Sequence, residues 1–230
     1  MLAEWPASSA AALRPEGLLC SVAESTEDKI DYVLEGTVNG AGSAIAWAID
    51  ELGISLDGPP PVDAWFASAA KMTESEEMPL FLNTIGGVGS PLWKTGVSAT
   101  WVDRLGQVVD PASLGTDVSM VAVVESILFL VRLNLDAMRS GGLNVGWIGV
   151  SGGLARSDAV CEFLADLTGC KVRRADVAEA TSAGVALLAA RSDGVCASVD
   201  SISTIEFCPR ELSRAKSSRY ASFIQLMTDL

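Results

Sequence analysis

Histidine is absent from this sequence of 230 residues. Its absence removes the usual general base, the Ser-His and Cys-His nucleophile pairs and most zinc sites. Catalysis, if the chain performs any, must therefore rest on carboxylates, backbone amides, lysine or arginine.

Positive charge is scarce. Lys and Arg number 16 against 29 Asp and Glu, so the formal net charge is −13. Such a surface repels phosphate backbones and anionic lipid headgroups, and we expect neither nucleic acid nor a membrane as partner. A small anionic ligand remains compatible with this charge, because backbone amides can hold a phosphate without any net positive charge.

Paired cysteine motifs are also missing. The five cysteines are scattered without a CxxC pair, and an odd number cannot all close into intramolecular disulfides. We interpret them as reduced thiols of a cytoplasmic protein. No basic stretch followed by an apolar block marks a secretion signal near the N-terminus. The longest apolar-rich stretch, residues 118–135, is interrupted by polar side chains and predicts a buried helix rather than a membrane span.

Hydrophobic residues make up 49% of the chain, which supports a substantial core. Periodicity predicts helices at 42–52, 62–72, 119–139, 181–191 and 211–230, and strands at 17–22, 30–35, 78–84, 97–102, 145–150 and 171–174. The first two strands are expected to form a hairpin. Strand and helix alternate in the second half, which predicts an α/β layer architecture with crossover helices.

Three glycine-rich turns stand out: "GTVNGAG" at 36–42, "IGGVGSPLW" at 85–93, and the Gly152-Gly153 pair. Bare backbone at such turns allows either tight packing or the close approach of a ligand, and spacing alone leaves both interpretations open. Ser157 or Asp158 can cap the helix after the pair, whose N-terminal dipole favours anionic groups.

Three further features have a structural and a functional interpretation. Trp93 is either the aromatic wall of a ligand site or a residue packed beneath its loop. The acidic segment 74–77 is expected to be a solvated loop rather than a metal cluster. Glu125 and Arg132 share one helix face, and we expect a structural ion-pair or hydrogen-bond role for them.

Four stretches together resemble the C-terminal half of the FGGY family of carbohydrate kinases, which includes glycerol, gluconate and xylulose kinases. The most specific is "ESILFLVRLNLDAM", which is similar to the family helix E-S-I-x-[FY]-x-x-R-x-x-L-x-A-M. The others are "YVLEGTVNGAGSAIAWAID", "GGLARSDAVCEFLADLTGCKV" and "EATSAGVALLAA". The resemblance runs from about residue 17 to 191.

The resemblance implies an α/β, ribonuclease-H-like (actin-like ATPase) lobe with a mixed central sheet and flanking helices. In the family, ATP and Mg²⁺ lie in the cleft between two lobes, and the C-terminal lobe makes most of the nucleotide contacts. Carried over, these contacts fall in three groups: Gly152, Gly153 and Ser157 at the adenine end, Gly42 and Ile45 near the ribose and phosphates, and Gly87 and Gly89 in a loop on the cleft side.

Some family features are missing. The segment "KTGVSAT" at 94–100 lacks a frequent arginine, Ala46 stands where the glycerol-kinase branch has glutamine, and "GGLARS" is more similar to the xylulose and gluconate branches. The Gly-Asp-Gln turn that carries the family's catalytic aspartate does not occur either. We therefore expect no catalytic residue and no metal ligand from this chain.

From these observations we expect residues 1–16 to be an N-terminal remnant or linker and residues 17–230 to be a C-terminal nucleotide-binding domain. The expected function is the ATP-binding lobe of a sugar or polyol kinase that lacks its sugar-binding lobe and is inactive alone. The alternative is a non-catalytic nucleotide-binding or interaction module. An apolar face left where another lobe packs could also drive formation of a homo-oligomer.

Overall fold

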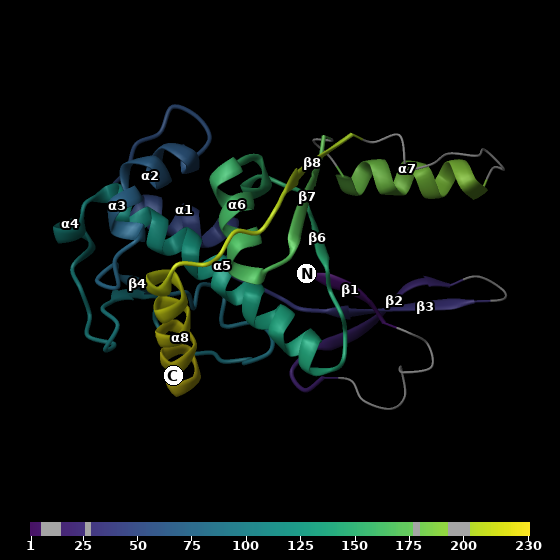
Figure 1. The fold of residues 1–230 in the computed structure, drawn as a ribbon, viewed down its shortest axis with the longest axis horizontal. Coiled ribbons are helices and arrows are strands. Elements are labelled where there is room, and N and C mark those ends of the chain that lie inside the picture. The colour runs from purple at the N-terminus through teal and green to yellow at the C-terminus, as the bar shows by residue number, and fades with distance from the viewer. Residues whose placement is uncertain (6–14, 26–28, 177–179, 193–202) are drawn as a thin grey trace. The chain divides into compact units, whose positions relative to one another are not determined.

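The computed structural model describes residues 1–5, 15–25, 29–176, 180–192 and 203–230. The chain forms two compact units, Met1–Asn144 with Leu212–Leu230, and Val145–Glu211. We refer to them as the first and second units and describe each by itself. Figure 1 labels their helices and strands.

A three-stranded antiparallel sheet opens the first unit. It contains β1 (Leu2–Trp5), β2 (Leu19–Ser25) and β3 (Ile30–Glu35), with β3 in the middle. The pairing of β2 with β3 confirms the expected hairpin. β1 was not anticipated, because it pairs with a strand far along the chain and lies within the segment 1–16 assigned to a remnant or linker. Trp5 and Leu34 pack with Leu18 and Met138 in a buried cluster, so these first residues contribute to the core.

Helix α5 (Thr116–Ser140) is the central helix of the first unit. Around it pack α1 (Gly42–Glu51), α2 (Val62–Ser68), α4 (Pro111–Leu114), α8 (Arg214–Asp229) and β4 (Leu80–Leu82). Although α5 is long and apolar enough to cross a membrane, 78% of its most apolar 18-residue window is buried inside the molecule. A helix that is apolar on nearly all sides belongs in a core. The expectation of a buried helix is thus confirmed.

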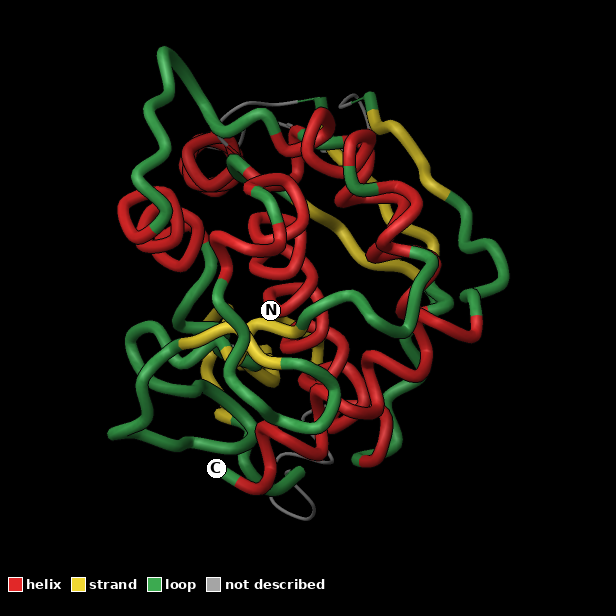
Figure 2. The backbone as a smooth tube through the Cα atoms, turned by 90° about the vertical axis from the view of Figure 1, so that its left-hand side faces the viewer, coloured by secondary structure: helices red, strands yellow, loops and turns green. Residues whose placement is uncertain are grey.

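Two sequence expectations for the first unit need correction. The single helix expected at 62–72 is two helices, α2 and α3 (Ala70–Thr73), separated at Ala69. The strands expected at 78–84 and 97–102 are only three residues long, as β4 and β5 (Thr100–Val102), and they pair antiparallel. Figure 2 draws the strands in yellow and the helices in red.

The second unit has the strand-helix-strand order that the sequence predicts. β6 (Trp147–Val150) lies parallel to β7 (Lys171–Ala175), and η2 (Leu154–Arg156) and α6 (Asp158–Thr168) connect them. β8 (Thr204–Phe207) pairs antiparallel with β7, which makes this sheet mixed. β8 was not predicted, since four residues carry little periodic signal. α7 (Ala180–Ser192) corresponds to the expected alanine-rich helix.

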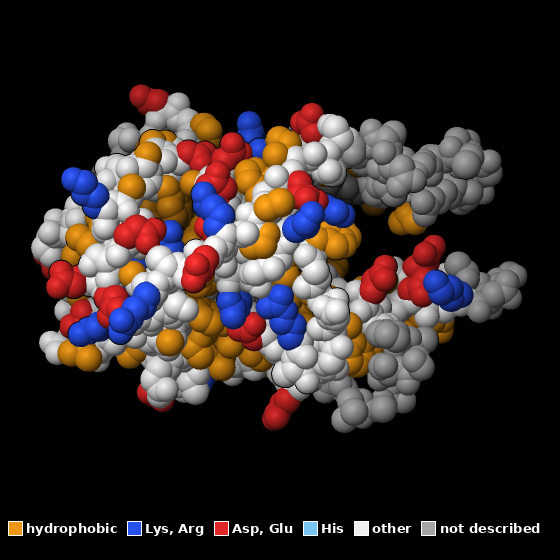
Figure 3. All heavy atoms as spheres, in the orientation of Figure 1, with side chains coloured by type: hydrophobic (Ala, Val, Ile, Leu, Met, Phe, Trp, Pro, Cys, Tyr) orange, Lys and Arg blue, Asp and Glu red, His pale blue; other side chains and the backbone are white. Residues whose placement is uncertain are grey.

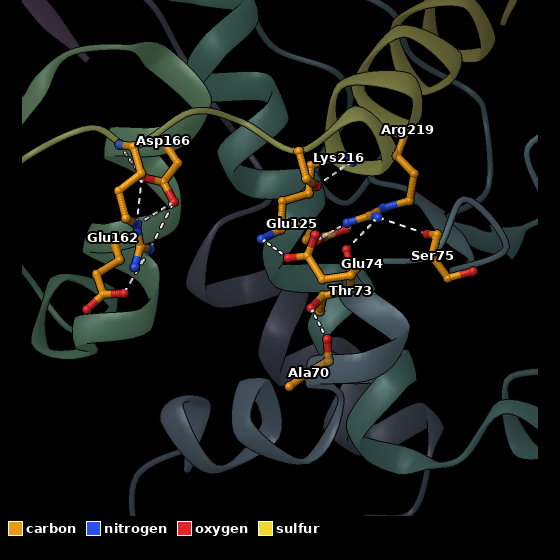
Figure 4. Close-up of polar contacts among 11 residues, drawn as sticks. Ala70, Thr73, Glu74, Ser75, Glu125, Glu162, Asp166, Lys216 and Arg219 are labelled. Atoms are coloured by element: carbon orange, nitrogen blue, oxygen red, sulfur yellow. Dashed lines mark hydrogen bonds and ion pairs between the residues drawn. The ribbon is translucent and has the colours of Figure 1, made fainter.

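A buried ion pair joins α8 to α5 (Figure 4). Arg219 donates from Nη2 to Oε1 of Glu125 at 2.5 Å, and both side chains are 1% exposed. The remaining guanidinium nitrogens donate to Oε2 of Glu125 at 3.3 Å and to the carbonyl oxygens of Thr73 at 2.8 Å and Ser75 at 3.0 Å. Burial raises the pKa of the Glu125 carboxyl, and the contact with Arg219 opposes that shift. The pair is therefore fully hydrogen-bonded, as a buried charge requires.

Glu125 and Arg132 both form ion pairs, as expected of a structural role, but each pairs with a different residue. Glu125 pairs with Arg219, whereas Arg132 pairs with Asp136 on its own helix at 2.9 Å. The Tyr220 hydroxyl donates to the same Asp136 at 2.9 Å, and burial raises the pKa of that phenol. α8 is therefore held against α5 by two contacts, Arg219 with Glu125 and Tyr220 with Asp136.

The acidic segment 74–77 is not simply a solvated loop. Glu74 pairs with Lys216 at 2.5 Å, and Glu76 pairs with Arg104 at 3.2 Å. Lys216 and Arg219, which both belong to α8, hold this stretch through Glu74 and through the carbonyls of Thr73 and Ser75. Arg104, the partner of Glu76, lies after β5 and not in α8. Among the described residues, no group of three or more potential metal ligands is found, there or elsewhere.

We expect the substitution Arg219→Ala to lower the free energy of unfolding by about 3–5 kcal/mol, because it leaves Glu125 buried without its counter-charge. Urea unfolding followed by circular dichroism measures the change. The double variant Glu125→Leu with Arg219→Met should be more stable than Arg219→Ala, since it buries no charge. Arg214→Ala is the matched control, because that side chain is 96% exposed. A loss below about 1 kcal/mol for Arg219→Ala would show that the pair is not a structural clamp.

Candidate functional site

Two of the glycine-rich turns lie against each other in the first unit. The side-chain amide of Asn39 donates to the carbonyl oxygens of Gly86 and Gly87, both at 3.1 Å. Asn83 donates in the same manner to the carbonyl oxygen of Gly40 at 2.7 Å. Side-chain amides thus link the turn at 36–42 to the turn at 85–93.

Helix α5 supplies the third member of this arrangement. Ser90 donates from Oγ to Oδ1 of Asn134 at 2.7 Å, and the backbone N–H of Thr37 donates to the same Oγ at 2.5 Å. Asn134 is fully buried and also donates to the carbonyl oxygen of Leu130 within the helix at 2.9 Å. The position of both turns is therefore fixed by a polar side chain on the central helix.

Three glycines are required by this packing itself. A Cβ atom would lie 2.1 Å from the Thr37 carbonyl oxygen if placed on Gly89, 2.2 Å from Asn83 Oδ1 on Gly40, and 2.6 Å from Asn134 Oδ1 on Gly36. These separations are far shorter than any tolerated contact. Gly89 was expected to contact a nucleotide, and the structure gives it a sufficient reason to be glycine within the chain.

The other candidate residues of the first unit differ in exposure. Gly87 has a φ of +82° and a potential Cβ contact of 3.3 Å to the Lys94 carbonyl oxygen, so its left-handed backbone favours glycine. Gly42 opens α1, is exposed, and has no described atom within 4 Å of a potential Cβ. Ile45, one turn on, is 5% exposed and packs in the core. Ala46 lies on the exposed side of the same helix.

The glycine pair of the second unit has open main chain. Gly152 and Gly153 are exposed, and a Cβ on either would meet no described atom within 4 Å. Gly152 has a φ of +92°, which explains its identity through backbone conformation. Gly153 has an ordinary helical φ of −58°. Neither the backbone nor the described packing requires glycine at 153, and this favours the ligand interpretation of the turn.

Ser157 begins α6 as expected. Its Oγ accepts from the backbone N–H of Val160 at 3.2 Å, and the residue is 5% exposed. Asp158 instead pairs with Arg174 of β7 at 2.7 Å. The prediction of a helix cap is confirmed. Contact of Ser157 with a nucleotide stays a prediction; in the cap its hydroxyl oxygen acts as an acceptor.

Trp93 matches both interpretations in part: it is partly exposed, and it is hydrogen-bonded to the segment beside its loop. The residue is 47% exposed, while its indole N–H donates to the Gly17 carbonyl oxygen at 2.6 Å. The residue has a φ of +50°, which a non-glycine side chain rarely adopts. Trp93 therefore fastens its turn to the segment before β2 and leaves one part of the ring to solvent.

Basic side chains of the second unit are largely paired with acids. Arg210 pairs with Glu162 at 3.0 Å and Asp166 at 2.9 Å (Figure 4), and Glu206 receives both Lys171 and Arg173. In Figure 3 acidic and basic side chains are intermixed over the face that is shown. An anionic ligand would accordingly be held by backbone amides more than by side-chain charge.

The structure groups the candidate residues in two sets. Gly42, Ile45, Gly87 and Gly89 belong to the first unit, where the turns at 36–42 and 85–93 are joined by hydrogen bonds. Gly152, Gly153 and Ser157 belong to the second unit. Sequence reasoning missed the polar side chains that contact these segments: Asn83, Ser90 and Asn134 in the first unit, and Arg174, which pairs with Asp158, in the second. Asn134 alone carried a signal, as an amide within an apolar helix.

Comparison with known proteins identifies the family. The C-terminal domain of the FGGY family of carbohydrate kinases matches residues 7–192, and the chain belongs to this family. Glycerol kinase of Shewanella frigidimarina is 32% identical over 202 residues, which cover 86% of this chain and 38% of that protein. The chain thus spans well under half the length of this curated relative.

Solved structures agree on the fold. The chain superimposes on Plasmodium falciparum glycerol kinase with ADP at a TM-score of 0.73 and 20% identity, covering 93% of this chain and 42% of that one. For ligand-bound xylulose kinase of Lactobacillus acidophilus the TM-score is 0.67 at 19% identity, with 93% and 41% covered. The ribonuclease-H-like, actin-like fold is confirmed. The sequence features that favoured the xylulose and gluconate branches contrast with the glycerol kinase found among the curated relatives.

We expect Gly89→Ala to lower the free energy of unfolding by about 1–3 kcal/mol, because its methyl group collides with the Thr37 carbonyl. Gly42→Ala should change it by less than about 1 kcal/mol, since its methyl group meets open space. Chemical unfolding of both variants beside the unsubstituted protein tests the difference. Equal stability of the two variants would contradict the packing assigned to Gly89.

Proposed function

We propose that this chain is the ATP-binding lobe of a kinase that transfers the γ-phosphoryl group of ATP to a hydroxyl of a sugar or polyol. The observation that carries the proposal is the exposed main chain at Gly152 and Gly153. It follows β6 and precedes α6, at the carboxyl end of a parallel strand, where α/β sheets place their ligands. Membership of the FGGY family and the ADP named with the Plasmodium structure support the choice of nucleotide.

Adenine is the part of ATP that fits this turn. A flat base can lie against main chain only where no Cβ intervenes, and Gly153 meets that condition without being forced to by its φ. A side chain at this position would stand in the way of the base. Gly152 and Gly153 therefore form the platform, and Ser157 fixes the direction of the helix behind it.

The start of α1 in the first unit, taken by itself, is suited to hold phosphate groups. No side chain caps this helix, and no acidic residue lies in its first turn. Its N-terminal amides can then donate to phosphate oxygens, and the helix dipole adds to the attraction. Gly42 leaves this approach open because it has no Cβ. The turn at 85–93 supports this loop through the contacts that Asn39 makes.

Mg²⁺ would accompany ATP and balance the charge on its phosphates during transfer. Phosphate oxygens commonly supply part of the coordination of Mg²⁺ at such sites. Gly-Asp-Gln is absent from the 230 residues, and the chain spans 38% of the Shewanella enzyme. We accordingly assign proton abstraction and the sugar contacts to parts of a complete kinase outside these residues. Turnover would belong to that complete kinase, in the cytoplasm.

A second candidate is a nucleotide-binding module without catalysis. It is motivated by Ala46, and by Ser98 in the segment that lacks the family's frequent arginine. Both candidates bind ATP and neither gives turnover by the 230-residue chain, so phosphorylation of glycerol, xylulose or gluconate by the purified chain would contradict both. Recovery of turnover when the family's N-terminal lobe is joined to this chain distinguishes the kinase from the module.

We expect ATP with Mg²⁺ to raise the thermal stability of the chain. At about 100 times the dissociation constant the gain is roughly 2.7 kcal/mol. Gly153→Ala should fold normally and lose most of this gain, because its methyl group occupies the adenine platform. Gly58→Ala is the control, since that glycine also has open space around it and lies outside the site.

Differential scanning fluorimetry and isothermal titration calorimetry measure both effects. An unchanged melting temperature together with no binding heat would refute ATP binding by this chain. Equal affinity of the Gly153→Ala and Gly58→Ala variants would leave ATP binding intact and show that the platform lies elsewhere.

A further inference from the structure

Arg174 of β7 lies behind the glycine turn of the second unit and reaches its main chain. Its Nη1 donates to the carbonyl oxygens of Ala155 at 2.9 Å and Arg156 at 3.2 Å. Its Nη2 pairs with Asp158 Oδ1, in the first turn of α6, at 2.7 Å. The side chain is only 17% exposed. One guanidinium thus bridges the end of η2 and the start of α6.

These two carbonyls need a partner from elsewhere in the chain. η2 is a single turn, closed by hydrogen bonds from the N–H of Arg156 to Gly153 and from the N–H of Ser157 to Leu154. The carbonyl oxygens at the end of such a turn, here those of Ala155 and Arg156, accept no hydrogen bond from within the turn. Ala155 is 6% exposed, which removes water as a full substitute. Cys161 adds a weaker donor, its Sγ lying 3.3 Å from the Ala155 carbonyl oxygen.

The guanidinium is itself held on the remaining side. Its central carbon lies 5.2 Å from the centre of the Phe207 ring, which belongs to β8. A planar, permanently charged group can fill three such roles at once, as donor to two carbonyls, ion-pair partner and stacked plane. Lysine offers only a point charge and cannot reproduce this geometry.

We propose that Arg174 is a positioning residue that holds the main chain from Gly153 to Ser157 in the shape that receives the nucleotide. The nucleotide part of this inference rests on the proposed function. Arg174 would touch no reacting atom. It acts through the turn, because the direction of the Gly153 peptide is set by η2, and η2 is anchored by the guanidinium.

The neighbouring residue provides a matched control. Arg173 projects to the other face of the same strand, where it pairs with Glu206 at 3.0 Å and lies over the Trp147 ring at 5.1 Å. Its side chain is 42% exposed. Arg173→Ala therefore removes an arginine, an ion pair and a stacked ring from β7 without touching the turn.

The experiment compares Arg174→Ala, Arg174→Lys and Arg173→Ala by two readouts. Amide hydrogen exchange of residues 153–157, without nucleotide, reports on the turn, and calorimetric titration with ATP-Mg²⁺ reports on binding. We expect Arg174→Ala to accelerate exchange in this segment and to weaken ATP binding about tenfold or more. For Arg174→Lys, the exchange rate and the ATP affinity should lie between those of Arg174→Ala and those of the unsubstituted protein. Arg173→Ala should leave both readouts unchanged.

Asp158→Asn keeps the experiment decisive if Arg174→Ala does not fold. Its carboxylate is 66% exposed, so this variant should fold, lose only the ion pair, and accelerate exchange to a smaller extent. Unchanged exchange in Arg174→Ala, or in Asp158→Asn where the former is unfolded, overturns the positioning role. Unsubstituted protein that binds no ATP refutes the proposed function separately, and the exchange readout then still decides whether Arg174 holds the turn.

Discussion

The ion pair between Glu125 and Arg219 is the constraint on which the first unit depends. Two charges that are each 1% exposed are stable only when every polar atom has a partner, and here the guanidinium reaches a carboxylate and two carbonyls. The pair fixes α8 on α5. Further along α5, buried Asn134 holds Ser90, and through it Thr37. One central helix therefore stabilises the C-terminal helix and sets the position of two glycine-rich turns.

The glycines of the glycine-rich turns fall into two groups: some are required by close packing, and others have open space beside them. Gly36, Gly40 and Gly89 let backbone and side chains pack at distances that a Cβ forbids. Gly42 and Gly153 have open space and no positive φ, so the described chain gives no reason of its own for glycine there. The distinction separates residues that build the loops from residues that leave room for a ligand. A resemblance between sequences assigns both kinds to the nucleotide site without distinguishing them.

Local pattern was enough for much of the fold. α5, α6 and the β2–β3 hairpin follow from periodicity and turn residues, because their contacts are close in sequence or repeat regularly. β1 and β8 could not be predicted, since their hydrogen bonds go to strands distant along the chain. Arg174 and Arg219 resemble surface residues in sequence, and only the fold shows what each one contacts. The positions of the candidate site came from resemblance; the polar side chains that hold it came from the structure.

Direct observation of the nucleotide on the chain is the sharpest test of the central claim. In a ¹⁵N-resolved NMR titration with ATP-Mg²⁺, we expect the largest shifts at the amides of residues 152–157 and 42–45. Amides around Gly58 and along the exposed part of α8 should not move. A titration that saturates while the amides of Gly152 and Gly153 stay unperturbed would show that adenine does not lie on this turn, and the account would fail.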